Sequence, residues 1–558
     1  MRPELPDAPR PPARALARLP LHPGTLDAAR ARALRSPLPR TDPSTGVWAH
    51  VREWAERDPD RVAAVSDAGT TTYRQLAHRV DQLRAALTAG SCTPGSRVAV
   101  AGPRSTDTIA AFLAIESLGA AYLPLAPDWP QARAEAVLRT AGPHCVLVPD
   151  TADATSVTAA RAAAGAAVPL LVFPPPAAAQ PGERLAPARV AAGDEPRYVI
   201  HTSGSTGGPK GVIVDQLGML NNLWFLVGRL QLTGADRVAF TAPPAFVISV
   251  WQMLAPLLVG ATVVIVTDAD QRFARRLAST VERTGVTVLE LVPTAIDWTV
   301  QEAARRGAGR EFARLRCLVS TGERLDPGIA GAALRLLPHV ELFNAYGATE
   351  CSDDVVLHRI TADDLAAPLL PVGRPAPGVV LYLLVHEDGA WRAAEPGEAG
   401  ELWVGGDAVS AGYLHDPERT AAAFYADGFD LASRTGRLYR TGDLARFADG
   451  IAHCLGRTDR QVKIGGVRIE LDEVEAALSA LPGVLGCAVL AEVQDGTAGL
   501  VAFFVAAPGV SRDTASDALR AALPAAFVPR RWVRLDSLPA NGSGKVDRLA
   551  LRSLAGAP

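Results

Sequence analysis

Apolar and polar positions alternate along the chain with two different periods. Residues 106–117 and 131–140 repeat apolar side chains at the spacing of an amphipathic helix, whereas residues 97–101 and 145–148 are short apolar runs typical of buried strands. Helix and strand patterns that follow one another in this way predict parallel sheets covered by helices. We therefore expect an α/β fold.

The pattern changes in the second half of the chain. Further strand patterns occur at residues 197–201, 261–266, 286–291 and 316–320, and a β-rich region punctuated by glycine covers 379–447. A last boundary is predicted at 456–459. We expect residues 41–458 to form a large N-terminal domain of parallel-type sheets with a β-rich subdomain, and residues 459–558 to form a small, mobile α+β lid domain.

The first 40 residues show no sustained periodicity. They are rich in Pro, Arg and Ala, which predicts a mobile leader at residues 1–40, to which we assign no function. No unbroken apolar stretch precedes Pro20, and no segment offers the roughly 20 apolar residues of a membrane span. Neither export nor a membrane partner is expected.

Composition narrows the class of partner. The net charge is −3, so no basic surface indicates binding to nucleic acid. Six cysteines are scattered without a Cys-x-x-Cys pair or a Cys/His cluster, which argues against a zinc site and against a disulfide framework. These features are typical of a cytoplasmic enzyme with specific small-molecule sites.

Lysine is confined to three positions. The 56 Lys and Arg residues include only Lys210, Lys463 and Lys545 as lysines, and each lies in a glycine-rich stretch. The planar fork of arginine cannot replace a compact ammonium group beside a phosphate oxygen or a carboxylate. The three lysines are therefore candidates for chemistry.

The first lysine ends a loop that is suited to phosphate. A predicted strand at 197–201 leads into the sequence TSGSTGGPKG at 202–211. Small residues let backbone N–H groups approach phosphate oxygens. The loop is not a Walker P-loop, because Gly211 follows Lys210 where that motif needs Ser or Thr. A GTPase or a motor ATPase is accordingly disfavoured.

Further motifs follow one another in order over most of the chain. They are TYRQL at 72–76, LGAAYLPLAPD at 118–128, the loop at 202–211, NAYGATE at 344–350, GEL at 400–402, YRTGD at 439–443, GRTD at 456–459, QVK at 461–463 and NGSGKVDR at 541–548. With these motifs the sequence resembles the adenylate-forming enzymes, and among them the adenylation domains of nonribosomal peptide synthetases, here as a stand-alone domain.

The resemblance implies a reaction and its cofactors, ATP and Mg²⁺. A carboxylate attacks the α-phosphate of ATP, giving an acyl-adenylate and pyrophosphate, and the acyl group then passes to a thiol. The residues implied to bind the nucleotide are Thr202, Ser203, Gly204, Ser205, Thr206, Gly207 and Lys210 for the pyrophosphate, Asn344, Ala345, Tyr346 and Gly347 for the adenine, and Asp443 with Arg457 for the ribose.

The resemblance also implies catalytic roles. Glu350 would bind Mg²⁺, Thr349 would lie at the α-phosphate, and Lys545 would bridge that phosphate and the substrate carboxylate. Asp459 matches the hinge about which the C-terminal domain swings between the two steps, and Lys463 would serve the second step.

One position departs from relatives that activate α-amino acids. They carry Asp where this chain has Val247, and that Asp pairs with the α-ammonium of the substrate. An unpaired, desolvated ammonium costs several kcal/mol, so an ordinary α-amino acid is disfavoured. Aligning the motifs places nine residues around the substrate: Val247, Ile248, Trp251, Glu290, Val319, Thr321, Ala345, Asp353 and Asp354.

Three of the pocket residues are acidic, and Glu290 interrupts an apolar run where a lone carboxylate would be expensive. We therefore expect a β-, γ- or ω-amino acid or a guanidino acid as substrate. The competing interpretation is a keto, hydroxy or aryl acid, with Asp353 and Asp354 capping a helix after Glu350 and Glu290 paired to an internal arginine.

The thiol acceptor is expected to act in trans. The chain ends ten residues after Arg548, which leaves no room for a carrier domain, so we expect a separate carrier protein bearing phosphopantetheine. Free coenzyme A is the alternative acceptor. A non-catalytic adenylate-binding regulator and a purely structural scaffold are the alternatives of other classes, and the presence of Glu350 and Lys545 argues against the regulator.

Overall fold

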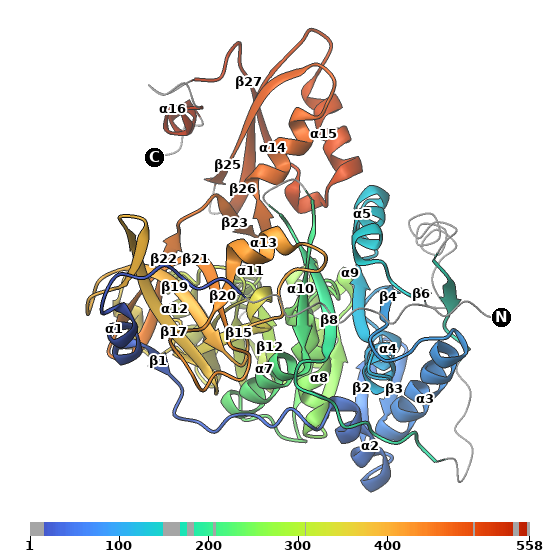
Figure 1. The fold of residues 1–558 in the computed structure, drawn as a ribbon. Coiled ribbons are helices and arrows are strands. Elements are labelled where there is room, and N and C mark those ends of the chain that lie inside the picture. Colours follow the sequence, from blue (N-terminus) through green and yellow to red (C-terminus); the bar gives the residue numbers. More distant parts are fainter. Residues whose placement is uncertain are drawn as a thin grey trace, which may run out of the picture.

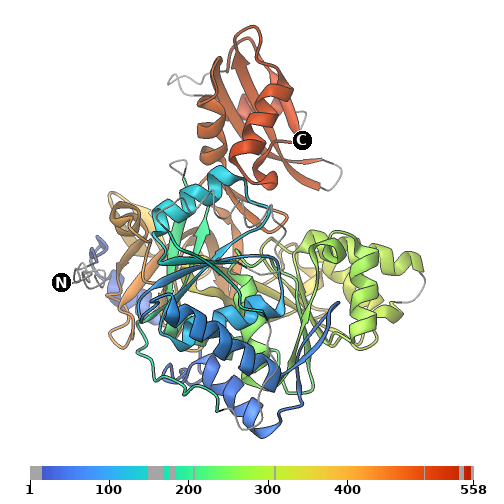
Figure 2. The ribbon, with the colours of Figure 1, turned by 90° about the vertical axis from the view of Figure 1, so that its right-hand side faces the viewer.

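The computed structural model describes residues 16–148, 168–175, 184–204, 208–306, 309–494, 497–539 and 546–554. Figure 1 shows a large body built on three sheets and a smaller C-terminal part at the top, and the view turned by 90° in Figure 2 shows the same separation. The α/β fold class, with a large N-terminal and a small C-terminal domain, is confirmed. The exact boundaries at 41 and 459 stay predictions.

The first sheet has six strands in the order β7-β6-β4-β5-β8-β9. Its neighbours are parallel except for β8 and β9, which form a hairpin around the glycine-rich loop. Its elements are β4 Arg97–Ala101, β5 Ala121–Leu125, β6 Cys145–Val148, β7 Leu170–Val172, β8 Pro196–Thr202 and β9 Lys210–Asp215, with helices α3 Tyr73–Ala89, α4 Thr106–Ser117 and α5 Gln131–Ala141.

The second sheet has nine strands in the order β16-β15-β14-β13-β12-β10-β11-β2-β3. Six central strands are parallel, and the edges add antiparallel strands. The strands are β2 Val62–Ser66, β3 Gly69–Thr72, β10 Arg237–Phe240, β11 Thr262–Ile265, β12 Val288–Leu291, β13 Cys317–Ser320, β14 Glu341–Ala348, β15 Asp353–Arg359 and β16 Arg374–Pro375.

Helices of the same region surround this sheet. They are α2 Val47–Arg57, α7 Gln216–Arg229, α8 Ile248–Leu258, α9 Asp268–Gln271, α10 Ala274–Thr284, α11 Pro293–Arg306 and α12 Pro327–Leu336. The yellow-green group of α10 to α12 forms one flank of the body at the right of Figure 2.

The third sheet is antiparallel and has seven strands. Its elements are β1 Leu34–Arg35, β17 Val379–Glu387, β18 Ala390–Ala393, β19 Gly400–Gly406, β20 Phe424–Ala426, β21 Arg437–Ala448 and β22 Ile451–Arg457, with helix α13 Pro417–Ala423. One apolar cluster contains residues of all three sheets, such as Val98, Val238 and Leu402. The large body therefore shares a continuous core.

The C-terminal part has a core of its own. A hairpin of β23 Gln461–Ile464 and β24 Val467–Glu470 leads into α14 Leu471–Ser479, and the rest is β25 Val484–Gln494, β26 Thr497–Ala506, α15 Arg512–Ala522, β27 Arg531–Arg534 and α16 Arg548–Leu554. Val474, Val489 and Phe504 are buried together there. A separate core is what a domain needs if it is to change its position as a unit.

The prediction of a mobile leader is wrong for residues 16–40. Helix α1 Thr25–Arg32 contacts β17 and β18 of the third sheet, and β1 is an edge strand of that sheet, where Leu34 pairs with Leu381 of β17. Arg30 donates 2.8 and 3.0 Å hydrogen bonds to the carbonyls of Phe429 and Gly428. The segment has no sustained apolar period, so its own pattern is weak, and the sheet edge and arginine contacts order it. Residues 1–15 lie outside the described ranges.

Within these described ranges, no helix has both the length and the apolar character required to cross a bilayer.

Candidate active site

The glycine-rich loop lies between paired ends of two strands. Thr202 at the end of β8 is opposite Lys210 at the start of β9, so the hairpin holds the loop by both ends. Ser203 is buried, and the hydroxyl oxygen of Thr202 is buried without a hydrogen-bond partner among the described residues. Such an orphan donor beside backbone N–H groups suits a phosphate ligand. Residues 205–207 lie outside the described ranges.

Glu350 is a fully buried carboxylate at the centre of the site. Its Oε1 accepts a 2.8 Å hydrogen bond from the Tyr413 hydroxyl and lies 3.2 Å from Lys210 Nζ. Its Oε2 accepts a 2.8 Å hydrogen bond from Arg468 of strand β24. Burial alone would raise its pKa, but the charges of Arg468 and Lys210 hold the pKa of Glu350 well below its usual range.

Lys210 is nearly buried and also contacts Tyr413. Its ammonium donates a 3.1 Å hydrogen bond to the Tyr413 hydroxyl and lies 4.7 Å from the centre of that ring. Burial lowers the pKa of Lys210, with Arg468 acting in the same direction and Glu350 against it. Lysine, carboxylate and tyrosine thus form one compact polar unit at the exit of the loop.

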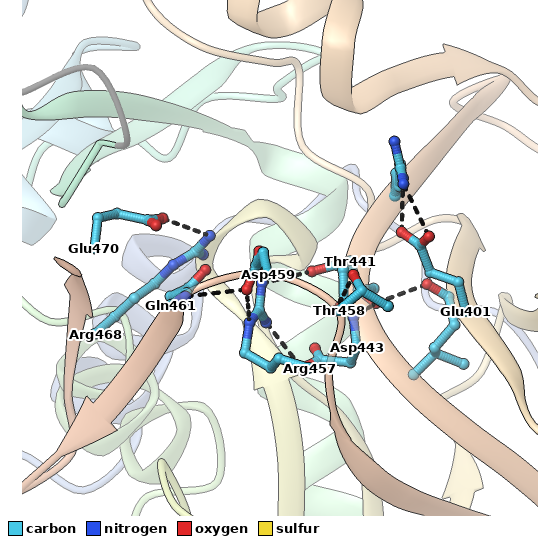
Figure 3. A network of polar contacts seen from close by, with 12 residues as sticks. Glu401, Thr441, Asp443, Arg457, Thr458, Asp459, Gln461, Arg468 and Glu470 are labelled. Atoms are coloured by element: carbon cyan, nitrogen blue, oxygen red, sulfur yellow. Dashed lines mark hydrogen bonds and ion pairs between the residues drawn. The ribbon is translucent and has the colours of Figure 1, made fainter. Parts of the chain in front are cut away.

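The proposed ribose and hinge residues form a second network, which Figure 3 shows. Asp443 accepts a 2.8 Å hydrogen bond from Arg457 and a 2.6 Å hydrogen bond from the Tyr346 hydroxyl. Arg457 also donates 2.7 Å hydrogen bonds to both carboxylate oxygens of Asp459, which in turn accepts a hydrogen bond from the backbone N–H of Gln461. The structure therefore brings Tyr346, Asp443, Arg457 and Asp459 together in one network.

The remaining residues of the 344–350 motif lie on β14 and the short helix η2 Thr349–Cys351. Asn344 and Ala345 are buried, and the side-chain amide of Asn344 donates a 2.8 Å hydrogen bond to the carbonyl of Pro371. Gly347 follows a bulge, and a Cβ there would lie 2.0 Å from the carbonyl oxygen of Asp353. Only glycine fits at this position. Thr349 is buried directly before Glu350.

Glu290 on β12 is buried in an apolar surrounding. Its Oε2 accepts hydrogen bonds from the indole N–H of Trp251 at 2.7 Å and from the Gln252 amide at 2.8 Å. Its Oε1 is buried and has no partner among the described residues. Burial and the neighbouring Asp354 raise the pKa of Glu290 well above its usual value.

Asp353 and Asp354 face the same region from the start of β15. Asp354 accepts a 3.2 Å hydrogen bond from Thr321, and burial raises its pKa to about 7 even though Thr321 and Lys463 lower it. Burial, Asp354 and Glu290 raise the pKa of Asp353, whose Oδ2 has no partner in the described part of the chain. Asp354 thus raises the pKa values of both other carboxyl groups, and Glu290 adds to the effect on Asp353.

Two structural details of the competing interpretation of the pocket are wrong. Residues from Asp353 to Arg359 form strand β15 and not a helix, because the bulge at Gly347 and the positive φ angles of Ser352 and Asp353, 60° and 94°, turn the chain straight back. Glu290 pairs with Trp251 and Gln252 and not with an arginine.

The apolar pocket residues lie on adjoining elements. Val247 directly precedes helix α8, which begins at Ile248 and also carries Trp251. Val319 on β13 is in register with Glu290 on β12. Val247, Trp251, Val319 and Ala345 belong to one buried cluster, with Ile248 packed against it. The structure thus brings Trp251 and Val319 beside Glu290, and Thr321 beside Asp354.

Of the two remaining lysines, Lys463 lies within the described ranges. Lys463 lies on β23, and burial lowers its pKa although the charges of Asp443 and Asp354 raise it. The charges of Asp443 and Asp354 thus reach the Lys463 ammonium and partly offset the effect of its burial. Lys545 lies outside the described ranges.

Glu350 is the candidate for Mg²⁺. In the described ranges, no group of three or more His, Cys, Asp or Glu side chains could hold a metal ion. A single ionised carboxylate still fits Mg²⁺, because this ion commonly uses one or two carboxylates together with substrate phosphates. Both oxygens of Glu350 have protein donors, and each keeps a further lone pair that Mg²⁺ could use.

Several residues of the site escaped the sequence analysis. Tyr413 belongs to none of the recognised motifs, whereas Arg468 lies five residues after Lys463 in a glycine-rich stretch and was open to recognition there. No sequence motif identifies Glu473 on α14 or Arg133 on α5. Glu473 accepts a 3.3 Å hydrogen bond from the backbone N–H of Gly204 and forms a 3.1 Å ion pair with Arg133.

Comparisons with known proteins agree with this geometry. The family model described as AMP-binding enzyme matches residues 51–414, and the model of the AMP-binding enzyme C-terminal domain matches 473–545. The chain is 36% identical over 525 residues to phosphinothricin tripeptide synthetase PhsB of Streptomyces viridochromogenes, covering 89% of this chain and 41% of that protein. It is 34% identical over 498 residues to a dimodular nonribosomal peptide synthase of Bacillus subtilis, covering 88% and 20%.

Solved structures are similar over almost the whole chain. PA1221 in its holo form, an NRPS protein containing adenylation and PCP domains, is 28% identical with a TM-score of 0.77, covering 92% of this chain and 84% of that one. The amide bond synthetase McbA from Marinactinospora thermotolerans is 25% identical with a TM-score of 0.79, covering 91% and 99%. The chain spans between 14% and 41% of the length of the curated relatives it matches.

Fold and site together define an adenylate-forming ligase that activates an acid. The chain belongs to the AMP-binding enzyme family, whose members use ATP, generally with Mg²⁺. Its similarity to adenylation domains of nonribosomal peptide synthetases is confirmed.

The raised pKa of Asp354 predicts how stability depends on pH. The folded protein keeps this proton up to about pH 7, whereas the unfolded chain releases it near pH 4. The unfolded state therefore binds fewer protons between these values, and the stability of the substrate-free enzyme should fall as pH rises from about 4 to 7. We expect Asp354→Asn to make this slope shallower, by at most about 1.4 kcal/mol per pH unit.

Thermal melts of both proteins across this pH range measure the difference. Equal slopes for Asp354→Asn and the wild type would show that Asp354 ionises at its ordinary pH.

Proposed function

We propose that the enzyme activates a small acid that carries a cationic group away from its α-carbon, a β-, γ- or ω-amino acid or a guanidino acid, and loads it onto the phosphopantetheine of a carrier protein. The substrate class is supported by two buried carboxylate oxygens, Glu290 Oε1 and Asp353 Oδ2, that have no hydrogen-bond partner among the described residues.

Burial without a partner is costly for a carboxylate. In the substrate-free protein the raised pKa values of Glu290, Asp353 and Asp354 reflect this cost. An ammonium or guanidinium group in the pocket would restore ionised carboxylates and supply hydrogen-bond donors for the free oxygens. Val247, directly before helix α8, has an apolar side chain and offers no partner for an α-ammonium. The pocket therefore favours a cation placed further from the carboxylate.

The first step joins the acid to AMP. A carboxylate oxygen of the substrate attacks the α-phosphorus, the bond to the β-phosphate oxygen breaks, and pyrophosphate leaves with the electron pair. Lys210 and the N–H groups of the 202–211 loop would hold the leaving pyrophosphate, and Lys545 would bring the carboxylate to the α-phosphate beside Thr349. Mg²⁺, held by Glu350, would supply positive charge to the phosphates. Tyr346 and Asp443 would orient the nucleoside.

The second step transfers the acyl group. The carrier thiolate attacks the acyl carbonyl, the bond to the AMP oxygen breaks, and AMP leaves with the electron pair. Lys463 lies near Asp443 and Asp354, so its charge is available at the junction of nucleotide and substrate for this step. A carrier protein as the acceptor is supported by the similarity to PA1221, an NRPS protein that contains adenylation and PCP domains.

The substrate class is tested by ATP-dependent hydroxamate formation over a panel of α-amino, β- and ω-amino, guanidino, keto and aryl acids. We expect the highest kcat/KM with a basic acid that lacks an α-amino group. Glu290→Gln and Asp354→Asn should each lower kcat/KM for that acid by roughly 10- to 100-fold, as expected when a buried charge loses its partner.

Glu341→Gln is the matched control, because Glu341 begins β14 outside the pocket and pairs with Arg359 on the surface. Its kinetics should equal those of the wild type. A preference for keto or aryl acids, or unchanged kinetics in both pocket variants, would contradict the proposed substrate class. ATP binding with no activity on any acid would favour a non-catalytic regulator.

Two lysine substitutions should separate the two steps. We expect Lys545→Ala to reduce hydroxamate formation by about 100-fold or more, since it removes a cation from the first transition state. Lys463→Ala should leave hydroxamate formation within a few-fold of the wild type while carrier loading falls by about 10-fold or more.

Carrier loading is measured by mass spectrometry of the phosphopantetheinyl protein. Equal losses in both assays for Lys463→Ala would contradict a role confined to the second step. Hydroxamate formation without loading of any carrier, but with transfer to coenzyme A or to an amine, would replace the carrier as acceptor.

A further inference from the structure

Gln252 connects the Glu290 carboxylate to the backbone at the end of β10. It lies on helix α8 one residue after Trp251 and is 1% exposed. Its Oε1 accepts hydrogen bonds from the backbone N–H groups of Thr241 and Ala242, at 2.9 and 2.8 Å. Its Nε2 donates a 2.8 Å hydrogen bond to Oε2 of Glu290. One buried amide thus joins the end of β10, helix α8 and strand β12.

Only one orientation of this amide satisfies its partners. A backbone N–H group donates and cannot accept, so the N–H groups of Thr241 and Ala242 require the amide oxygen of Gln252 on their side. The amide NH₂ group must then face Glu290. The structure therefore places a donor, and not an acceptor, against this carboxylate.

Trp251 and Gln252 donate to the same oxygen of Glu290. The indole N–H lies 2.7 Å from Oε2, which Gln252 also binds, whereas Oε1 is buried without a partner among the described residues. Both lone pairs of Oε2 are used, so the proton of the neutral form, or a cation that replaces it, has its place at Oε1. Burial and Asp354 raise the pKa of Glu290, and the hydrogen bonds from Gln252 and Trp251 lower it. The two donors thus favour the ionised form that a cationic partner needs.

We propose that Gln252 is a positioning residue for substrate selectivity, which holds the Glu290 carboxylate so that Oε1 is free for the cationic group of the substrate. This role rests on the proposed function, because it takes Glu290 as the partner of that cationic group. It adds a residue that acts through Glu290 and has no contact of its own with the reacting atoms.

Misplacement of the carboxylate and damage to the fold have different effects on selectivity. Damage to the fold lowers activity on basic and neutral acids alike, whereas a misplaced carboxylate lowers only the activity on basic acids. The quantity to measure is the selectivity ratio, kcat/KM for a basic acid divided by kcat/KM for its neutral isostere, from hydroxamate formation. The pairs are β-alanine with butanoate, γ-aminobutyrate with pentanoate, δ-aminovalerate with hexanoate, and γ-guanidinobutyrate with γ-ureidobutyrate.

Gln252→Met keeps the length of the side chain and removes both of its hydrogen-bonding atoms. We expect the selectivity ratio of the best pair to fall roughly three- to tenfold, because Glu290 loses one of its two donors. Gln301→Met is the matched control, since Gln301 donates a 2.8 Å hydrogen bond to a carboxylate, that of Asp297, on the exposed side of α11. Its selectivity ratio should equal that of the wild type.

A double variant shows whether Gln252 acts through Glu290. If it does, Gln252→Met combined with Glu290→Gln should have the selectivity ratio of Glu290→Gln alone. A further fall of the ratio in the double variant, or an unchanged ratio in Gln252→Met, overturns the inference.

A second measurement needs no variant. In a crystal structure of the wild type with the preferred basic acid, the cationic group should lie within hydrogen-bond distance of Glu290 Oε1, with Trp251 and Gln252 still on Oε2. A cationic group bound to Oε2, or an amide of Gln252 turned away from Glu290, overturns the inference. If Glu290→Gln lowers the selectivity ratio and Gln252→Met does not, the proposed substrate class still stands. A wild-type ratio near one for every pair would overturn both.

Discussion

The buried carboxylate of Glu350 is the interaction on which the site depends. It is reached by Lys210 from the phosphate loop, by Tyr413 from the segment after β19 and by Arg468 from the C-terminal domain. An ionised carboxylate in this position is stable only while cations and donors surround it. Three separate parts of the chain are therefore held in register by one charge.

The substrate pocket has the opposite electrostatic character. Glu350 has cations beside it and a lowered pKa, whereas Glu290, Asp353 and Asp354 have one another and raised pKa values. Both groups are fully buried, so burial does not explain the difference. Lys210 and Arg468 pair directly with Glu350, whereas the charge of Lys463 lowers the pKa values of Asp353 and Asp354 without offsetting the effect of burial. A basic group on the substrate would complete the pocket in the way that protein cations complete the nucleotide site.

The features that could be predicted from the sequence are those whose residues lie close together in the chain. The strand and loop at 197–211 are predictable because strand residues, small residues and the lysine are adjacent in the chain, and Asp443, Arg457 and Asp459 lie within short motifs that meet in one network. The contacts between Arg133 and Glu473 and between Arg468 and Glu350 join residues far apart in the chain. The apolar pattern of the sequence does not predict such contacts. Strand β15 was predictable in neither type nor direction, since a bulge and positive φ angles redirect the chain after Glu350.

The most direct test is a crystal structure of the enzyme with Mg²⁺ and a non-hydrolysable ATP analogue. We expect the metal at Glu350, the triphosphate beside Lys210, and the ribose hydroxyls at Asp443. A metal ion away from Glu350, or a nucleotide that contacts neither Lys210 nor Asp443, would contradict the proposed site.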